Sequence, residues 1–340
     1  MGTYRFFLAI FVALSHLGIT FFAISTGISA VVSFFLLSGF VMTALITKSY
    51  STADRVGAFY LDRAMRLFPQ FLLYLVATLA VVLLLKPQSI YLSDLTPVKV
   101  ALNALMIPLN FFMVGDLMTG MLMPQAWSLG LEAVFYLVIP WLIILKLRVP
   151  AFIASAAVFL CAYAGAIDSD TWAYRLLPGS LFIFLLGSFM HGRSPWKRRV
   201  LIGSFITSVV LSGVLLANPL LMRIAMLDML AGIAFGVPMV LLLKDLKLPK
   251  IDTHLGNISY GVFLNHFLLI WIFEHFGIRT WGALNTAVLF ACSIALAALT
   301  YRFIEKPVVD MRHRLRRRLV DESEPETTKF SAPARARAGV

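Results

Sequence analysis

The first hydrophobic stretch of the chain reads RFFLAIFVALSHLGITFFAI and runs from Arg5 to Ile24. It has the length of a membrane span, which needs about 20 apolar residues. His16 lies in the middle of the run, where a titratable side chain costs free energy unless it faces a protein interior or a cavity. Arg5 and His16 are eleven residues apart, a helical rise of about 16 Å. An anion held at the membrane surface by Arg5 therefore reaches His16 only if it is long and thin, which predicts an extended, phosphate-bearing substrate.

The composition of the whole chain is that of a membrane protein. Of its 340 residues, 60% are hydrophobic and 14% are charged, whereas soluble domains have about a quarter charged residues. We therefore predict an all-α polytopic membrane protein. The net charge of +12 is assigned first to one side of the lipid bilayer, so it does not indicate nucleic acid as a partner.

The two cysteines and the start of the chain suggest no other class. Cys161 and Cys292 both lie in apolar runs, and their spacing suits neither a metal site nor a disulfide framework. We predict that they are small buried hydrophobic residues, and that the protein uses no metal. The start resembles a signal peptide, but the apolar run continues past His16 without a convincing small-residue cleavage site.

Ten stretches have the character of membrane spans. They lie at about residues 5–24, 28–46, 69–86, 127–145, 149–166, 176–190, 200–217, 224–243, 258–276 and 282–304. The apolar stretch 98–114 is interrupted by Asn103, Pro108 and Asn110. We predict a re-entrant or interfacial segment there, because irregular backbone is tolerated at membrane depth where it lines a protein cavity.

The distribution of Lys and Arg predicts the orientation of these spans. With the N-terminus in the cytoplasm, the basic clusters at 48–66, 146–148, 193–199 and 244–250 all lie inside. Both termini are then cytoplasmic. We predict that residues 308–340 form a disordered, basic-then-acidic cytoplasmic tail, whose basic block at 312–318 lies against anionic lipid headgroups.

The segment FYLDRAMRLFP, residues 59–69, carries two arginines three residues apart. On a helix, Arg63 and Arg66 share a face, and two guanidinium groups at a membrane surface make a phosphate clamp. The alternative is simple anchoring of the inside loop. We predict that Pro69 begins the next span, since proline is favoured in a first helical turn.

The segment AWSLGLEAVFYLVIP, residues 126–140, places Glu132 within the first two turns of an apolar helix. This carboxylate is either a partner of the helix dipole or a functional acid that faces a cavity. Trp127 suits a membrane interface. Ser128 is a candidate for an N-cap or for an active hydroxyl.

The segment ISYGVFLNHFLLI, residues 258–270, contains a second intramembrane histidine, His266, preceded by Asn265. A packing hydrogen bond between helices is one reading, and a role in the same cavity as His16 is the other. The chain ends its last span with YRFIEKP, residues 301–307, where Glu305 and Lys306 suit a surface ion pair. No phosphate loop, dinucleotide fingerprint or zinc motif is present in the sequence.

These stretches, in this order, resemble the acyltransferase 3 family, the integral-membrane O-acyltransferases of bacteria. The resemblance rests on Arg5 with His16, FFLLSGF at 34–40, RAMRLFP at 63–69, WSLGLEAVFYLVIP at 127–140, SYGVFLNHF at 259–267 and YRFIEKP at 301–307. Two features depart from the family pattern. The lead-in before FFLLSGF is STGISAVVS, and Asn265 stands where an aromatic residue is usual, so the departures concern the acceptor.

The resemblance implies a ten-helix acyltransferase domain over residues 1–307, in the bacterial cytoplasmic (inner) membrane. It implies transfer of an acyl group, by default acetyl, from cytoplasmic acyl-CoA to a hydroxyl of a cell-surface or exported glycan or glycolipid. Arg5, Arg63 and Arg66 would hold the CoA phosphates, and His16 would be the general base. Glu132 would orient His16 or receive the acceptor. Trp127, Ser128, Asn265 and His266 are expected to contact substrate; for the oxyanion, Trp127 and Asn265 are possible donors.

Two other function classes fit parts of the pattern. A proton-coupled transporter or flippase of a glycan precursor also carries intramembrane His and Glu, although the sequence shows no inverted repeat. A scaffold in glycan synthesis would tolerate loss of His16, Arg63 and Glu132 together.

Overall fold

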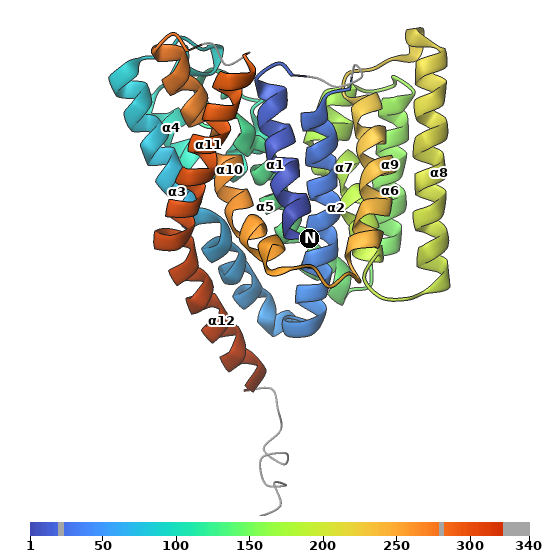
Figure 1. Cartoon of the computed structure of the whole chain (residues 1–340). Helices are drawn as coiled ribbons and strands as arrows, with labels where there is room; N and C mark the ends of the chain where they lie inside the picture. The colour runs from blue at the N-terminus through green and yellow to red at the C-terminus, as the bar shows by residue number, and fades with distance from the viewer. Residues whose placement is uncertain (20–23, 279–281, 322–340) are drawn as a thin grey trace, which may run out of the picture.

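The computed structural model describes residues 1–19, 24–278 and 282–321, and all regular elements within these ranges are helical (Figure 1). The α-helices are α1 (Gly2–His16), α2 (Thr26–Ser49), α3 (Val56–Leu85), α4 (Pro97–Ala104), α5 (Trp127–Ile144), α6 (Arg148–Tyr163), α7 (Leu177–Phe189), α8 (Pro195–Ala217), α9 (Met226–Leu243), α10 (Lys250–His275), α11 (Ala283–Thr300) and α12 (Lys306–Asp321). Short 3₁₀ or π-helical turns join several of them, among them η3 (Ile107–Phe111), η6 (Asp170–Arg175) and η8 (Tyr301–Glu305).

The predicted class, an all-α polytopic membrane protein, is confirmed. Each of the ten predicted spans contains a helix. Within the described ranges, seven helical segments are long and apolar enough to cross a membrane, and α6 and α7 are shorter apolar helices. The outermost helix, α8, exposes a row of large apolar side chains, as a lipid-facing helix does: Ile202, Phe205, Ile206, Val209 and Val210.

The cysteine prediction was wrong. Cys161 and Cys292 are both exposed on the helix bundle. They lie on apolar helices, α6 and α11, whose outer faces are the surface that lipid covers in a membrane protein. An apolar run in such a protein does not distinguish the interior from the lipid-facing side, because both are apolar.

The first span is shorter than predicted. Helix α1 has 15 residues and ends at His16. Gly18 follows with a φ of +77°, the left-handed conformation in which glycine commonly ends a helix. The predicted span at 5–24 is therefore wrong beyond His16, and its part at 20–23 lies outside the described residues. His16 is the last residue of a helix instead of the middle of one.

The third span is longer than predicted. Helix α3 begins at Val56 and runs for 30 residues with Pro69 inside it, so the prediction that Pro69 starts the span was wrong. A proline costs a helix one hydrogen bond and some strain, which membrane helices tolerate because neighbouring groups compensate. Arg63 and Arg66 consequently lie within a continuous helix that packs against α10 and α12, and not in a surface loop.

The interrupted stretch at 98–114 forms two short elements, α4 and η3. The two asparagines that break its apolar pattern are buried and bind loop backbone. Asn103 donates to the carbonyl of Gly120 at 2.7 Å and accepts from the N–H of Leu122 at 3.0 Å, and Asn110 donates to the carbonyl of Arg175 at 2.6 Å. These hydrogen bonds join the segment to the loop before α5 and to η6, and its re-entrant or interfacial position in the membrane stays a prediction.

The predicted disordered tail from residue 308 is helical at its start. After the π-helical turn η8, helix α12 runs from Lys306 to Asp321, and residues 322–340 lie outside the described residues. Pro307 does not stop the helix, because it occupies the first turn, where a missing N–H costs nothing. Helix α12 packs against α3 and α2, so part of the basic block lies against protein.

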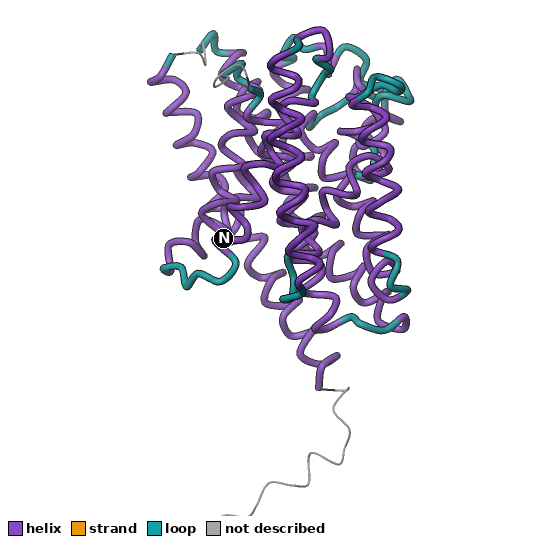
Figure 2. The backbone as a smooth tube through the Cα atoms, turned by 90° about the vertical axis from the view of Figure 1, so that its right-hand side faces the viewer, coloured by secondary structure: helices purple, strands orange, loops and turns teal. Residues whose placement is uncertain are grey.

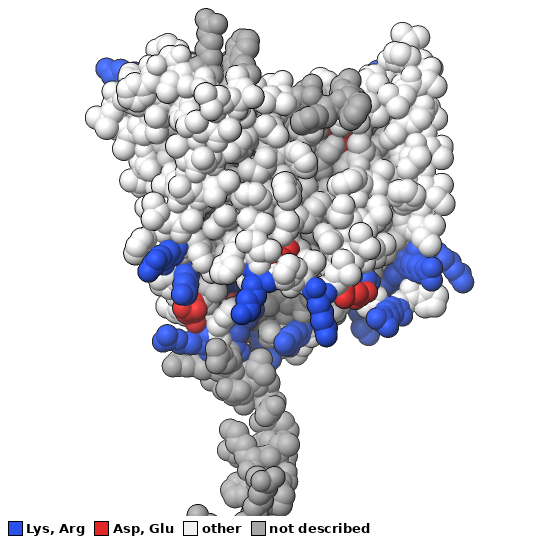
Figure 3. Space-filling model, viewed as in Figure 1, with Lys and Arg blue, Asp and Glu red and all other residues white. Residues whose placement is uncertain are grey.

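Figure 1 shows α1 in the middle of the bundle, with α8 at one edge and α12 extending from one end. Figure 2, turned by 90°, shows most loops gathered at the two ends of the bundle. In Figure 3, Lys and Arg side chains form a band across the end from which α12 extends, while the rest of the visible face is nearly free of charge. We call this end of the molecule the basic end.

Candidate active site

Helix α1 is the central element of the site and packs against α2 and α10. Its first turn is held by Asp252 of α10, whose carboxylate accepts hydrogen bonds from the backbone N–H groups of Gly2 at 2.9 Å and Thr3 at 2.8 Å. A carboxylate also suits the positive end of the helix dipole. This contact helps explain why α10 begins at Lys250, earlier than the predicted residue 258. Arg5 lies just beyond the anchored turn.

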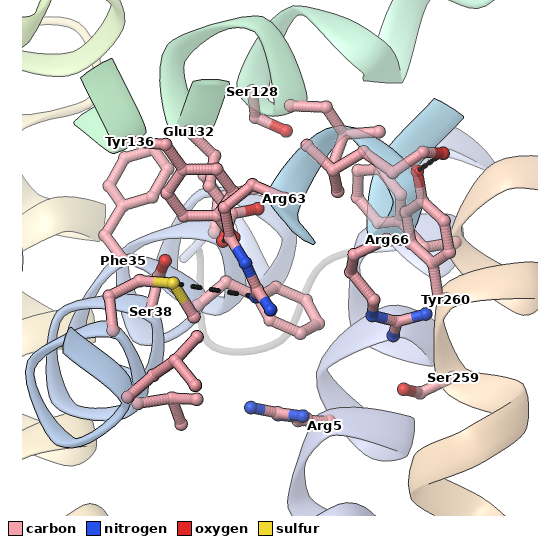
Figure 4. Close-up of a pocket in the computed structure, with 18 of the residues that line it drawn as sticks. Arg5, Phe35, Ser38, Arg63, Arg66, Ser128, Glu132, Tyr136, Ser259 and Tyr260 are labelled. Atoms are coloured by element: carbon pink, nitrogen blue, oxygen red, sulfur yellow. Dashed lines mark hydrogen bonds between the residues drawn. The ribbon is translucent and has the colours of Figure 1, made fainter. Parts of the chain in front are cut away.

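A cavity of about 310 Å³ lies beside the start of α1 and is strongly basic. The charged residues of its lining are Arg5, Arg63, Arg66, Glu132, Arg312 and Arg316. Figure 4 shows the guanidinium groups of Arg5, Arg63 and Arg66 directed into a common space. The structure thus brings together the three arginines that the sequence indicated, and we call this space the arginine cavity.

The three arginines are held in different ways. Arg66 forms an ion pair with Glu305 of η8, which is buried. Arg63 forms an ion pair with its neighbour Asp62 and contacts a methionine sulfur of α2 at 3.6 Å. Among the described residues, Arg5 has no ion-pair partner within 4.0 Å. Its charge is therefore the one most available to a ligand.

Two further arginines reach the arginine cavity from α12. Arg312 binds both carboxylate oxygens of Asp62, with Nε 3.1 Å from Oδ1 and Nη2 3.1 Å from Oδ2. Arg316 Nε lies 3.4 Å from Oδ1 of the same carboxylate. Asp62 therefore joins α12 to α3, and three guanidinium groups surround one buried carboxylate.

Glu132 lies on the wall of the arginine cavity, where its Oε1 accepts a hydrogen bond from the hydroxyl of Tyr136 at 2.6 Å. Figure 4 shows both side chains beside Arg63. A second cavity, described below, is lined by His16 but not by Glu132. Glu132 thus faces a cavity, but the structure does not place it beside His16, as a role in orienting His16 requires.

The second cavity, of about 230 Å³, lies at the C-terminal end of α1. There His16 Nδ1 is 3.3 Å from His266 Nε2, and the two rings stack with centroids 5.2 Å apart and planes at 21°. His266 is fully buried, whereas His16 lines the cavity and is accessible. His266 contacts His16 across the interface between α10 and α1 but does not line the cavity itself, so its substrate contact stays a prediction. We call this space the histidine cavity.

Aromatic groups and one cation form the outer wall of the histidine cavity. Trp127 and Tyr174 make an edge-to-face pair with centroids 4.9 Å apart. The guanidinium of Arg175 lies 4.8 Å from the Trp127 centroid, and its Nε is 2.7 Å from Asp170 Oδ2. The ion pair and the cation–π contact hold Arg175 against the Trp127 ring.

The arginine and histidine cavities share a wall. Val31, Ser128 and Phe263 line both of them. Ser128 is the second residue of α5 and makes no capping hydrogen bond, so the predicted N-cap role was wrong. Its hydroxyl donates to the carbonyl of Gln125 at 3.1 Å, which leaves its oxygen lone pairs able to accept a hydrogen bond from a molecule that passes between the cavities.

Asn265 lies away from both cavities. Its amide nitrogen donates to the backbone carbonyl of Ser293 at 2.9 Å, and its oxygen accepts from the hydroxyl of the same serine at 2.5 Å. Successive residues of a helix point about 100° apart, so Asn265 faces α11 while His266 faces α1. We assign Asn265 to helix packing and not to the predicted substrate contact.

Sequence reasoning missed the groups that hold the arginines in place. Asp62 and Glu305 are both nearly buried acids, and the sequence placed Glu305 in a surface ion pair with Lys306. The sequence contains a signal that could have identified them. Each of the two acids lies in a segment that also carries an arginine or is otherwise apolar. Arg312 lies in the basic block at 312–318, which the sequence analysis assigned to a disordered tail.

The fold and the two cavities define an integral-membrane protein with an internal site that is basic at one end and carries a histidine pair at the other. The family profile described as "Acyltransferase domain" matches residues 3–302, so the chain belongs to this acyltransferase 3 family and is a membrane acyltransferase, as the resemblance predicted. The chain is 31% identical over 203 residues to an uncharacterized protein of Aquifex aeolicus (strain VF5), over 57% of this chain and 91% of the relative. No solved structure matches the chain significantly.

Proposed function

We propose that the protein transfers an acyl group, with acetyl as the first donor to test, from cytoplasmic acyl-CoA to a hydroxyl of a cell-surface or exported glycan or glycolipid. The observation that carries the proposal is the shared wall of the two cavities. A basic cavity beside the start of α1 and a histidine cavity at its end both reach Ser128 and Phe263. Two substrates of different chemistry can therefore meet across the protein.

The donor is assigned to the arginine cavity. CoA carries several phosphates at one end and its thioester at the other, so it suits a basic entrance that leads to an inner reaction centre. On the visible face, the Lys and Arg side chains gather at the end of the bundle that bears α12 (Figure 3), and basic ends of this kind face the cytoplasm in inner-membrane proteins. We therefore place both termini and the CoA entrance on the cytoplasmic side of the bacterial inner membrane.

The acceptor is assigned to the histidine cavity, where Trp127 and Tyr174 offer aromatic surfaces to a sugar ring. His16 Nε2 is the nitrogen left for substrate, because Nδ1 faces His266. It takes the proton of the acceptor hydroxyl while that oxygen bonds to the thioester carbonyl carbon. When the tetrahedral intermediate collapses, the C–S bond breaks and the leaving thiolate receives the proton from His16.

Glu132 has a separate role in this scheme. It lies on the donor side of the shared wall, where a carboxylate accepts hydrogen bonds from the amide N–H groups of a pantetheine arm. Its hydrogen bond from Tyr136 fixes the carboxylate in that position. Glu132 would thus position the thioester for the base.

The experiment is thiol release from acetyl-CoA by the purified protein in nanodiscs, with and without a crude surface-glycan fraction. We expect release that rises when glycan is added, and acetylated glycan by mass spectrometry. Succinyl-CoA and longer donors run in parallel, because the acyl group is a default choice. If no acyl-CoA is bound or consumed while a glycan precursor crosses the membrane of sealed vesicles, the proposal is wrong. The protein would then be a transporter or flippase.

A further inference from the structure

Helix α12 is an unassigned part of the arginine cavity. It begins at Lys306, whereas the family match ends at residue 302. Arg312 and Arg316 are four residues apart, so they lie on one face of the helix, and both line the arginine cavity. Arg314 lies between them in sequence and is exposed. One face of α12 thus turns two guanidinium groups toward the cavity and leaves the third outside.

The carboxylate that holds Arg312 and Arg316 has more cationic partners than it can neutralise. Asp62, with only 1% of its side chain exposed, is in contact with Arg63, Arg312 and Arg316 at once. Arg312 is itself 5% exposed. One carboxylate neutralises one guanidinium, so this cluster keeps an excess of positive charge in a poorly solvated place, which costs free energy unless further anions are present.

The rest of the arginine cavity does not remove the excess. Its lining has five arginines and one acid, Glu132, and Glu305 is already engaged by Arg66. Among the described residues, the buried Nε of Arg316 has no aligned hydrogen-bond acceptor, although it lies within ion-pair distance of Asp62. The lining of the cavity therefore carries an excess of positive charge, which suits a ligand that carries more than one negative charge.

We propose that Arg312 and Arg316 of α12 bind phosphate groups at the nucleotide end of acyl-CoA, so that α12 completes the donor site. The inference rests on the proposed function. Asp62 holds the two guanidinium groups at the cavity that Arg5 and Arg66 also line, and the same cavity reaches Ser128. A planar guanidinium binds a phosphate through two parallel hydrogen bonds, which a lysine cannot reproduce.

The test compares two donors on variants of the full chain in nanodiscs. Acetyl-CoA carries the phosphates, and S-acetylpantetheine carries the same thioester without them. We expect Arg312→Gln and Arg316→Gln each to raise the KM for acetyl-CoA about tenfold, with kcat little changed and with no change in the KM for S-acetylpantetheine. Arg314→Gln, which removes the same charge from the exposed face of α12, is the matched control and should leave both constants unchanged.

We expect both single variants to fold, because each of them leaves Asp62 with two arginine partners. A change in KM then reports on donor binding. An equal loss with both donors would mean a structural role for α12, and an unchanged KM for acetyl-CoA would mean no role in the donor site; each overturns the inference and leaves the proposed function standing. Arg312→Lys should recover only part of the affinity.

Equilibrium binding of CoA itself separates the inference from the proposed function. If the wild-type protein consumes no acyl-CoA but binds CoA in a manner that needs Arg312, the function is wrong and the phosphate site stands. If the wild-type protein neither binds CoA nor consumes acyl-CoA, both are wrong. Binding of 3′-dephospho-CoA measures which phosphate the arginines contact, since loss of the Arg312 effect with this ligand assigns Arg312 to the 3′-phosphate.

Discussion

The two cavities differ in how the protein holds their functional groups. In the arginine cavity, the cations are fixed by buried carboxylates, with Asp62 and Glu305 each engaged in ion pairs. In the histidine cavity, His16 contacts a second imidazole, and the described structure gives it no carboxylate partner. Fixed charge suits binding of a phosphate-bearing molecule, whereas an imidazole without a counter-ion can gain and lose a proton. In the proposed function, this difference corresponds to donor binding at one end of α1 and chemistry at the other.

The largest effect is expected in the histidine cavity, at the end of α1 to which we assign the chemistry. His16→Ala should lower kcat about 10²- to 10⁴-fold, because a positioned general base contributes about that much to rate. The KM for acetyl-CoA should stay within about twofold, since the donor phosphates lie at the other end of α1. Steady-state thiol release measures both constants. A variant that keeps full kcat, with a normal elution profile in detergent, would remove His16 from the chemistry.

The next effect tests the binding end and uses two arginines that differ only in their partners. Arg66→Gln leaves the carboxylate of Glu305 buried without a cation, so it should lower the free energy of unfolding by about 2 kcal/mol and also raise the KM for acetyl-CoA. Arg5→Gln should raise that KM about tenfold and leave stability unchanged, because Arg5 has no ion pair to lose. Thermal unfolding in detergent and donor saturation curves give the comparison. Equal destabilisation by both variants would contradict it.

A smaller effect tests the acceptor side of the histidine cavity. Trp127→Ala removes one aromatic surface and the support of Arg175, so the KM for the glycan acceptor should rise about fivefold. Trp127→Phe keeps a ring and should recover most of that loss. The KM for acetyl-CoA should not change in either variant. A selective effect on the donor would mean that the two cavities have been assigned the wrong substrates.

The smallest effect concerns a charged cluster whose residues line neither cavity. Lys99 Nζ donates to Asp94 at 2.6 Å and to Asp116 at 3.1 Å, and its proximity lowers the pKa of the Asp116 carboxyl. A lowered carboxyl pKa stabilises the folded cluster above the usual Asp pKa of about 3.9, and this contribution is lost as the pH falls through the lower folded value.

We therefore expect amide exchange in residues 115–121 to be protected at neutral pH and to quicken, relative to intrinsic rates, below about pH 4. Lys99→Met should produce the same loosening at pH 7. Because the cluster does not line the arginine cavity, this variant should leave the KM for acetyl-CoA unchanged, which shows that loss of a cation alone does not weaken donor binding. A raised KM would weaken the assignment of the arginine cavity.

Much of the fold could be predicted from the sequence because membrane spans are a property of local composition. The length and polarity of each apolar run decide whether a helix can satisfy its backbone in lipid, so all ten predicted spans contain a helix. The ends were predicted less well. Gly18 ended α1 early, Pro69 failed to start α3, and α12 continued where a tail was expected.

The site was predicted in part for a similar reason. Arg5, His16 and Glu132 stand out because polar side chains are rare within apolar runs, and each lines a cavity. Asn265 stands out equally but serves helix packing. Rarity therefore identifies a side chain that needs a partner, but it does not say whether that partner is a substrate or a neighbouring helix.

The sequence by itself determined that this protein is an all-helical membrane protein, and it indicated Arg5, His16 and Glu132, which line the cavities. Only the tertiary structure decided which of them meet. His16 and His266, separated by 250 residues, stack together, and Asp62 gathers Arg312 and Arg316 from a distant helix. The physical reason is that helix formation depends on neighbours along the chain, whereas charge pairing and ring stacking depend on contacts that only the packing of helices creates.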